Sequence, residues 1–487
     1  MKKILIKTAA FLVGIIICTG IISAKEINAV PKDDQLPVNR TVNLNGSEYT
    51  VKTIDYNYSN NTFISLRDMA AVLKDSPKAF SLTITADDIE ITRGGTYEAA
   101  EGDLTGFSDE VLAGTYHGET IKRPSMKIDG NDVKYYCIVT SLAENGADCY
   151  MNLVDFSMVF DLAFEKESDT GYSLDSGKSY IISMNDIEEA GYFNAFRGVV
   201  VGDATTGEIY YSFRGDNSTA IASTTKLMTY LIVRDSIESG AYSMSDKVEA
   251  TREVRDVSVS ADGTFEMPVG SSATVKEMLE CMLLPSSNEA TLALAIHDAG
   301  SHEAFVEKMN AKAMALGLKG THFVNCNGLP LYTKDKVPAK LQNVMTPEDM
   351  FILASHIVTT YPDYEEIMGK KSAVISSYGE EVKNINPLLY NMPAVNGMKT
   401  GSTNLAGYCL VSSMPVSAGG MEHVIVAAEF GAESYEEQAR SSELLLRYGK
   451  QQFLNRYGDN ESSGETVDIP TNSGALIDRV LQFMKNK

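Results

Sequence analysis

The chain has 487 residues, of which 44% are hydrophobic and 22% are charged. This length and composition predict a globular protein of two or three domains and exclude a fibrous or disordered chain. The formal net charge of −23 argues against nucleic acid as a partner, because proteins that bind nucleic acid carry stripes of basic residues.

Residues 1–24 have the three parts of a secretory signal peptide. A basic start is followed by an apolar run over 9–22 and by two small residues. Ile22 is bulky for a position where cleavage favours a small side chain, so the segment is either a cleaved signal or an uncleaved anchor. No other stretch is long and apolar enough to span a bilayer. We therefore predict export, with a polar linker over 25–40.

Export permits disulfide bonds, so each cysteine is a candidate for a bridge or a metal site. Five remain after the signal segment, at Cys137, Cys149, Cys281, Cys326 and Cys409. Cys137 and Cys149 are the only close pair, and the sequence leaves open whether they form a bridge or are ordinary small apolar residues. The histidines are scattered and no HExxH motif occurs, so we predict neither a metal site nor a cofactor.

An internal repeat follows the linker. "VNLNGSEYTV" (42–51) resembles "MKIDGNDVKY" (126–135), and both carry a dipeptide that favours a tight hairpin turn. Downstream, "TFISLRDMAAVL" (62–73) matches "CYMNLVDFSMVF" (149–160). Each copy predicts a hairpin, a strand and a short amphipathic helix, and the two copies form one α+β module over 41–165.

Polar residues mark the start of both predicted helices. Ser65 and Asn152 stand at helix N-cap positions, and Asp68 and Asp155 follow three residues later, close to a capping box. The module resembles the copper-amine-oxidase N-terminal-like stalk domain of surface proteins in Gram-positive bacteria. The resemblance implies a spacer or wall-contacting role without copper, because His117 is the only histidine in the module.

A second linker is predicted over 166–180, and the third part of the chain covers 181–457. Two strands begin it, helical patterns dominate from 220 to about 360, and three strands and a closing helix end it. This order predicts one antiparallel sheet interrupted by a helical region, within a multidomain α+β chain. A linker over 458–474 precedes the amphipathic tail 475–487, which fits either a membrane surface or the protein itself.

The apolar stretch "AIASTTKLMTYLIV" (220–233) contains Ser223 and Lys226, which form a Ser-x-x-Lys pair. Side chains three residues apart share one helix face. The helix dipole disfavours a protonated amine at a helix N-terminus, and a buried lysine has a lowered pKa and can act as a base. A buried serine beside a lysine that reaches solvent remains the structural alternative.

Two further motifs follow in order. Ser286 and Asn288 stand at a helix start after a proline, and Lys399 and Thr400 stand on a predicted strand. Ser286 lies 63 residues after Ser223, and Lys399 lies 113 residues after Ser286. Each motif alone is read as a helix cap or a turn lysine, whereas the three together indicate one catalytic site.

The third part resembles the serine D-alanyl-D-alanine carboxypeptidases, the low-molecular-weight penicillin-binding proteins. The similarity extends over "IASTTKLMTYLIV", "LLPSSNEATLALA" and "VNGMKTGSTNLAGYCLVSS". It implies a DD-peptidase/β-lactamase-like fold, a five-stranded antiparallel sheet with an inserted helical region. It also implies peptidoglycan stem peptides ending in D-Ala-D-Ala as substrates and β-lactams as inhibitors. The expected location is the cell wall or the outer face of the cytoplasmic membrane.

The resemblance implies a role for each motif residue. Ser223 would attack the carbonyl of the penultimate D-Ala and form an acyl-enzyme, and neutral Lys226 would take its proton. Ser286 and Asn288 would complete the proton relay and hold the substrate amide. Lys399 would keep the site positive and help to lower the pKa of Lys226.

The same resemblance implies a substrate-binding strand. Thr400, Gly401 and Ser402 would bind the terminal carboxylate and amide of the substrate. The backbone N–H groups of Ser223 and Ser402 would form the oxyanion hole.

The sequence also departs from the family pattern. Ser287 replaces the usual glycine, Glu289 replaces the common aspartate, and "VNCNGL" (324–329) replaces a segment that often carries proline and histidine. These changes would narrow the cleft or alter substrate choice. Two alternatives stay open: a β-lactamase-like hydrolase, for which no Glu-x-x-x-Asn segment is evident, and a non-catalytic wall-binding module of the same fold.

Overall fold

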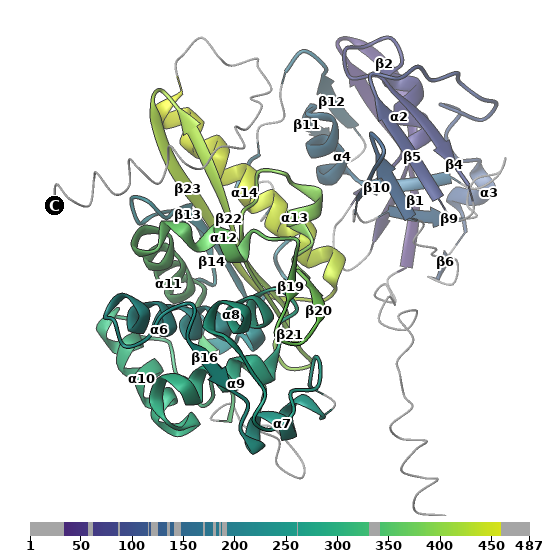
Figure 1. Cartoon of the computed structure of the whole chain (residues 1–487). Coiled ribbons are helices and arrows are strands. Elements are labelled where there is room, and N and C mark those ends of the chain that lie inside the picture. The colour runs from purple at the N-terminus through teal and green to yellow at the C-terminus, as the bar shows by residue number, and fades with distance from the viewer. Residues whose placement is uncertain are drawn as a thin grey trace, which may run out of the picture.

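The computed structural model describes residues 34–458 apart from short internal segments (Figure 1). The segments outside the description are 57–61, 86–87, 115, 118–124, 134–136, 141–147, 169–170, 179–181, 185–186, 188–191, 261 and 331–340. The predicted signal segment 1–24, the amphipathic tail 475–487 and the linker before it from residue 459 also lie outside the described residues.

The described residues of the N-terminal module (34–175) form two sheets and three short helices. Its elements are β1 (Asp34–Leu44), β2 (Ser47–Tyr56), β3 (Thr62–Ser65), α2 (Leu66–Leu73), β4 (Phe80–Ile84), β5 (Asp88–Arg93), α3 (Asp109–Leu112), β6 (Tyr116–His117), β7 (Ser125–Ile128), β8 (Asn131–Val133), β9 (Cys137–Thr140), β10 (Asp148–Asn152), α4 (Leu153–Phe160), β11 (Ala163–Ser168) and β12 (Gly171–Asp175). The larger sheet has the order β11-β12-β1-β2-β3-β10-β9, with β6 also pairing β1, and the smaller has the order β4-β5-β7-β8.

Both predicted hairpin turns have the backbone that their dipeptides favour. Asn45 and Gly46 have φ values of 51° and 93°, and Asp129 and Gly130 have values of 52° and 78°. Positive φ at both central residues is the requirement of a tight two-residue turn whose twist matches the strands. The first turn joins β1 to β2 and the second joins β7 to β8.

The helix caps form as expected, whereas the acids after them have other partners. The Ser65 side chain accepts from the Asp68 N–H, and the Asn152 side chain accepts from Val154 and Asp155 N–H groups. The Asp68 carboxylate accepts the backbone N–H of Lys52. A capping box uses Glu or Gln, whose longer side chain reaches back to the cap.

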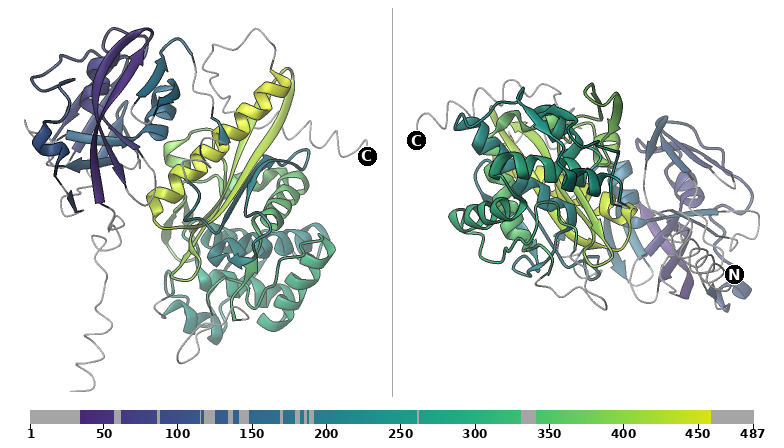
Figure 2. Two further views of the ribbon diagram at one scale, coloured as in Figure 1. Left: turned by 180° about the vertical axis from the view of Figure 1, so that it is seen from behind. Right: turned by 60° about the horizontal axis from the view of Figure 1, so that its bottom comes forward.

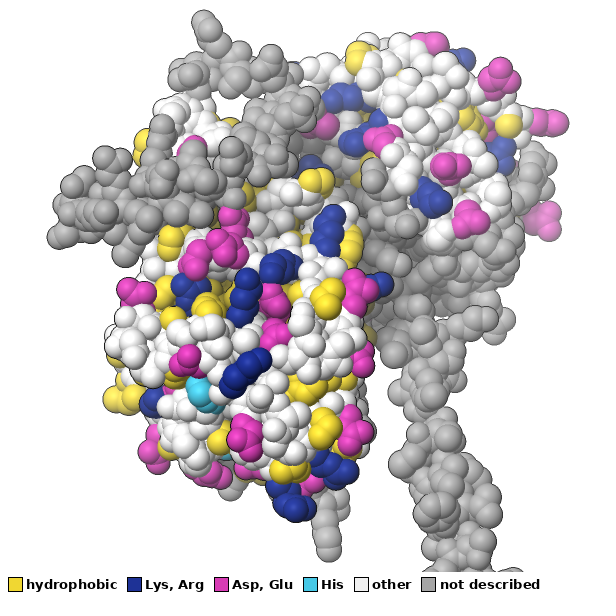
Figure 3. Space-filling model, in the orientation of Figure 1, with side chains coloured by type: hydrophobic (Ala, Val, Ile, Leu, Met, Phe, Trp, Pro, Cys, Tyr) yellow, Lys and Arg dark blue, Asp and Glu magenta, His cyan; other side chains and the backbone are white. Residues whose placement is uncertain are grey.

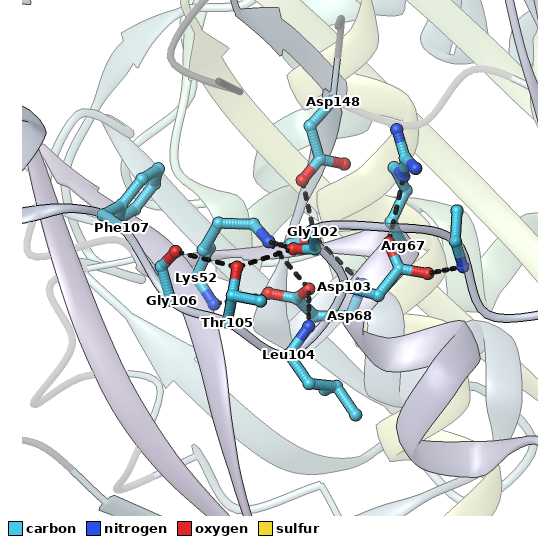
Figure 4. A network of polar contacts seen from close by, with 12 residues as sticks. Lys52, Arg67, Asp68, Gly102, Asp103, Leu104, Thr105, Gly106, Phe107 and Asp148 are labelled. Carbon is cyan, nitrogen blue, oxygen red and sulfur yellow. Dashed lines mark hydrogen bonds and ion pairs between the residues drawn. The ribbon is translucent and has the colours of Figure 1, made fainter. Parts of the chain in front are cut away.

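Asp68 lies at the centre of a buried polar network in the N-terminal module (Figure 4). Its Oδ1 accepts from Lys52 Nζ at 2.9 Å and from the backbone N–H of Leu104 at 2.9 Å. Lys52 Nζ also donates to the carbonyl of Gly102 at 2.8 Å, and Asp148 accepts from the hydroxyl of Ser65 at 2.8 Å. The network therefore attaches the loop around residues 102–104 to β2 and α2.

Two predicted linkers are partly wrong. Residues 34–40 belong to β1, residues 163–168 form β11 and residues 171–175 form β12. β12 pairs in parallel with β1, and its Tyr172 and Leu174 are buried in the core of the module. The Gly, Ser and Asp content of this stretch indicates a loop locally, but burial of alternate apolar residues stabilises a strand.

The C-terminal part (residues 182–457) contains a second large sheet and most of the helices (Figure 1). Its elements are β13 (Gly198–Asp203), β14 (Glu208–Phe213), β15 (Thr219–Ala220), the 3₁₀ helix η1 (Ala222–Thr225), α6 (Lys226–Glu238), β16 (Lys247–Glu249), α7 (Arg252–Ser258), β17 (Ser272–Thr274), α8 (Val275–Leu283), α9 (Asn288–Ala299), α10 (His302–Ala315), β18 (Val344–Met345), α11 (Pro347–Thr360), η3 (Pro362–Tyr364), α12 (Glu365–Met368), β19 (Ser372–Ile375), β20 (Glu380–Lys383), α13 (Leu388–Asn391), β21 (Gly397–Thr403), β22 (Gly407–Ala418), β23 (Met421–Ala432) and α14 (Tyr435–Tyr457).

The main sheet of this part is antiparallel, with five strands in the order β14-β13-β23-β22-β21. Helix α14 covers one face, where α13 joins the same buried cluster, and the helices between residues 226 and 368 lie on the opposite side (Figure 2). Val199 and Val201 of β13 contribute to the core beneath α14, whereas Val200 contributes to the core on the other face. This alternation is the two-residue period of a strand buried on both sides. The chain therefore has a mixed α+β fold.

The N-terminal module contacts the C-terminal part through α4. Met158 of α4 belongs to the same buried hydrophobic cluster as Leu445 of α14. Asp155 Oδ2 accepts from Arg440 Nη1 at 3.3 Å, and both side chains are almost fully buried. The Arg440 guanidinium also lies over the ring of Tyr192, 5.1 Å from its centroid. Burial raises the pKa of Asp155 to about 6, although the charge of Arg440 acts in the opposite direction.

Acidic and basic side chains are interspersed over the face drawn in Figure 3. Within the described residues, no helix combines the length and the apolar composition that crossing a membrane needs.

Cys149 of β10 pairs with Val139 of β9. The side chain of Cys137 lies outside the described part of the chain, so the possible bridge between the two cysteines stays a sequence-based prediction.

Replacing the buried cation at this interface is expected to weaken it. Arg440→Met leaves Asp155 buried without its partner, and breaking a buried pair from one side costs about 3–5 kcal/mol of unfolding free energy. Calorimetric unfolding of the full chain measures the loss. The control is Lys178→Met, which removes the exposed ion pair with Asp175 and should leave unfolding unchanged. Equal unfolding curves for the two variants would show that the pair does not hold the interface.

Candidate active site

Ser223 and Lys226 meet at the start of α6. Ser223 lies in η1, and Lys226 is the first residue of the α-helix that continues it. A 3₁₀ turn has three residues per turn, so side chains three positions apart project in the same direction. Lys226 Nζ lies 2.9 Å from Ser223 Oγ, and the lysine side chain is fully buried. The expected pair is therefore formed by a tight turn rather than by a regular α-helix.

Lys226 has two other hydrogen-bond acceptors in addition to Ser223. Its Nζ lies 2.9 Å from Asn288 Oδ1, at the start of α9, and 3.0 Å from the carbonyl oxygen of Asn327. Three segments that are distant in sequence therefore converge on a single amine.

Burial controls the charge of both lysines at the site. It lowers the pKa of Lys226 to about 7, with nearby Cys326 and Glu289 acting in the opposite direction. The pKa of Lys399 is held well below its ordinary value by burial and then by the charge of Lys226. The sequence predicted that Lys399 lowers the pKa of Lys226, whereas burial is the main cause for each.

Ser286 follows Pro285 in the turn between α8 and α9, and Asn288 is the first residue of α9. Asn288 Nδ2 donates to the carbonyl of Asp262 at 2.9 Å while its Oδ1 faces Lys226. Ser287, not Ser286, is the N-cap of α9 and accepts from the N–H of Ala290. Ser286 has a φ of 69°, and its buried Oγ has no hydrogen-bond partner among the described residues. Strained backbone of this kind concentrates at functional sites.

Lys399, Thr400, Gly401 and Ser402 lie on β21, the edge strand of the main sheet. A Cβ on Gly401 would stand 2.8 Å from the backbone nitrogen of Ser223, so only glycine lets β21 lie this close to η1. Lys399 Nζ donates to the carbonyl of Thr400 at 3.0 Å. The Thr400 Oγ1 is buried without a partner among the described residues, and Ser402 is exposed at the edge.

Segment 324–329 contacts η1, the turn that carries Ser223, and the sequence did not predict this contact. Gly328 has a φ of +89°, and a Cβ there would stand 1.9 Å from the carbonyl oxygen of Ala222. Asn327 reaches Lys226 through its backbone carbonyl, which any residue type can supply. The departure from the family pattern at this segment was the available signal, but it did not indicate a backbone contact.

The other departures from the family pattern stabilise the loop beside α9. Glu289 is fully buried, and its Oε1 accepts the backbone N–H groups of Thr264 and Phe265 at 2.9 and 3.0 Å. Ser287 caps the helix.

Within the described residues, no cluster of three or more histidine, cysteine or acidic side chains could hold a metal ion.

The arrangement can perform nucleophilic acyl transfer. A hydroxyl lies next to an amine whose pKa is about 7, at the N-terminus of a buried helix. Edge strand β21 lies against the same turn and leaves one side available for an extended peptide.

The comparisons with known proteins agree with this chemistry. A family model described as D-alanyl-D-alanine carboxypeptidase matches residues 190–429. A D-alanyl-D-alanine endopeptidase of Pseudomonas aeruginosa is 32% identical over 256 residues, which are 52% of this chain and 77% of the relative. The chain belongs to the D-alanyl-D-alanine carboxypeptidase family.

Two further known proteins are similar over about half of the chain. The D-alanyl-D-alanine carboxypeptidase DacF of Bacillus subtilis is 33% identical over 267 residues, which are 53% of this chain and 62% of the relative. The chain thus spans less than two thirds of the length of that family member. A solved structure of a peptidoglycan synthesis regulatory factor (PBP3) from Streptococcus pneumoniae overlaps with a TM-score of 0.47 at 27% identity, covering 53% of this chain and 72% of that one.

The packing of segment 324–329 predicts a difference between two glycine variants. Gly328 and Gly270 have φ values of +89° and +82°, but a methyl group would meet other atoms within 4 Å at Gly328 and none at Gly270. A left-handed alanine costs about 1–2 kcal/mol at either position. Gly328→Ala adds a clash with Ala222, so it should lower the unfolding temperature clearly more than Gly270→Ala. Equal losses in thermal unfolding would contradict the close packing.

Proposed function

We propose that the chain is a serine D-alanyl-D-alanine carboxypeptidase that removes the terminal D-Ala from peptidoglycan stem peptides. The observation that carries the proposal is the 2.9 Å separation between Ser223 Oγ and the Nζ of the fully buried Lys226. Membership of the family and the order of the three motifs support it.

In the proposed acylation, Ser223 Oγ attacks the carbonyl carbon of the penultimate D-Ala and transfers its proton to Lys226. The tetrahedral intermediate then breaks its C–N bond. The departing D-Ala amine receives the proton held by Lys226, passed on by the Ser286 hydroxyl, while Asn288 completes the relay by holding the Lys226 amine and the substrate amide. The product is an ester of the shortened peptide on Ser223. Water hydrolyses this ester, with Lys226 as the base, and restores the serine. β-lactams would acylate Ser223 by the same attack.

Strand β21 would orient the substrate. Thr400 Oγ1 is buried without a described partner, so it can donate to the terminal carboxylate of the peptide, and Lys399 lies buried beside it on the same strand. The backbone beyond Gly401 would pair with the peptide along the sheet edge. The N–H groups of Ser223 and Ser402 would form the oxyanion hole, and donors of this kind contribute a few kcal/mol to transition-state stabilisation.

The organisation of the chain follows from the same proposal. Residues 181–457 would form the peptidase domain. The N-terminal module would form the stalk, and its strands extend the predicted range 41–165 to 34–175. The basic and apolar start supports export of the enzyme to the cell wall or the outer face of the cytoplasmic membrane. The tail 475–487 is proposed to contact that membrane peripherally.

Labelling with a fluorescent penicillin tests the activity. We expect stable labelling of the wild-type chain, release of D-Ala from a D-Ala-D-Ala peptide and slow turnover of a chromogenic cephalosporin. Ser223→Ala should abolish all three, whereas Ser239→Ala, at the exposed end of the same helix, should leave them unchanged. Rapid cephalosporin hydrolysis would instead favour a β-lactamase, and absence of labelling would favour a non-catalytic wall-binding module.

The lowered pKa of Lys226 predicts the pH dependence of acylation. The amine is a base only when neutral, so the second-order acylation rate should rise with pH and level off above a midpoint near the pKa of about 7. Lys226→Arg keeps the charge at every pH and should lose about 10²–10⁴-fold in rate. Lys319→Arg, at an exposed position, is the control. A rate independent of pH across this midpoint would exclude Lys226 as the base.

A further inference from the structure

The orientation of the Lys226 amine depends on two fixed acceptors. A neutral amine has two N–H donors and one lone pair. Asn288 Oδ1 and the Asn327 carbonyl lie 2.9 and 3.0 Å from Lys226 Nζ, and together they can accept both N–H groups. The lone pair then faces the Ser223 hydroxyl, 2.9 Å away, and can accept its proton. If the Asn327 carbonyl moved, the amine could turn and donate to Ser223 instead.

The Asn327 carbonyl is positioned by the side chain of Asn325. Asn325 Oδ1 accepts the backbone N–H of Asn327 at 3.2 Å and that of Gly328 at 2.7 Å. Its Nδ2 donates to the carbonyl of Leu329 at 2.6 Å. One buried amide therefore replaces the backbone partners that a regular element would supply across this turn.

Asn343 fixes this turn to the nucleophile helix. Only 1% of Asn343 is exposed. Its Oδ1 accepts the N–H groups of Val324 and Asn325 at 2.7 and 3.2 Å, and its Nδ2 donates to the Asn325 carbonyl at 2.9 Å. The same Nδ2 lies 3.0 Å from the Thr225 Oγ1, one residue before Lys226. A single side chain thus joins the turn that carries one acceptor to the turn that carries the nucleophile.

We infer that Asn343 is a positioning residue for the reaction: it aims the Lys226 lone pair at Ser223 by joining the Asn325 turn to Thr225. This inference rests on the proposed function. The hydrogen bonds of the Asn343 side chain go to Val324, Asn325 and Thr225, so its effect on the reaction passes through the Asn325 turn and the Asn327 carbonyl.

Two substitutions separate this role from simple stabilisation. Asn343→Leu keeps the approximate volume and removes all of the side-chain hydrogen bonds, and Thr225→Val removes only the one to the Thr225 hydroxyl. The matched control is Asn384→Leu, because Asn384 is also buried and donates to two carbonyls, those of Met368 and Lys370. Penicillin acylation of each folded variant is resolved into the dissociation constant of the initial complex and the acylation rate constant.

We expect Asn343→Leu to lower the acylation rate constant at least tenfold with little change in the dissociation constant. Thr225→Val should lower it to a smaller extent, and Thr225→Ser should restore it. The pH midpoint of acylation should move away from the wild-type value in Asn343→Leu. Asn384→Leu should lower stability but should change neither the acylation rate constant nor the pH midpoint.

The outcomes separate the positioning role from the proposed function. Failure of the wild-type chain to be acylated would overturn the proposed function itself. Acylation of the wild type with an unchanged rate constant and midpoint in Asn343→Leu would overturn the positioning role alone. If Asn343→Leu does not fold, Thr225→Val decides, because a wild-type acylation rate constant in that variant would show that the connection to η1 does not aim the amine.

Discussion

The structure of the site depends on keeping one amine out of water. Lys226 is fully buried at the start of α6, and the charged form of a lysine in such a place is disfavoured. Two directed acceptors, one from α9 and one from the backbone of Asn327, then fix the position of this amine. Gly401 permits β21 to lie directly against η1, the turn that carries Ser223. A buried lysine would normally destabilise a fold, whereas under the proposed function its lowered pKa lets it act as a base.

The residues that sequence reasoning located are those whose chemistry lies in their side chains. Ser223 and Lys226 are recognisable from local spacing, and the site places them and Asn288 together. Asn343 was not predicted, because its contacts with Asn325 and Thr225 join segments distant in sequence and because a lone asparagine carries no motif. The same limit applies to the fold. The hairpin turns follow from their dipeptides, whereas β12 depends on pairing with β1 far away in the chain.

The two copies of the N-terminal repeat show how equivalent positions acquire different uses. Asp68 and Asp155 both follow a helix cap by three residues. Asp68 accepts hydrogen bonds from Lys52 and Leu104 and so holds its own module together. Asp155 instead meets Arg440 of α14 in a buried contact. The position is buried in both copies, so each carboxylate needs a donor, and the second copy obtains its donor from the C-terminal part.

This contact has a consequence for how a stalk would act. α14 packs on β22, and residues 407–413 of β22 pair with β21, the strand that carries Lys399 and Thr400. The N-terminal module is therefore attached to the layer directly behind the edge strand rather than to a remote loop. If the stalk were joined only by a flexible linker, it would set only the distance between the site and the proposed peptidoglycan substrate. Attachment through Arg440 and the cluster around Met158 also fixes the direction in which the edge of β21 faces, because a buried, packed interface restricts rotation as well as separation.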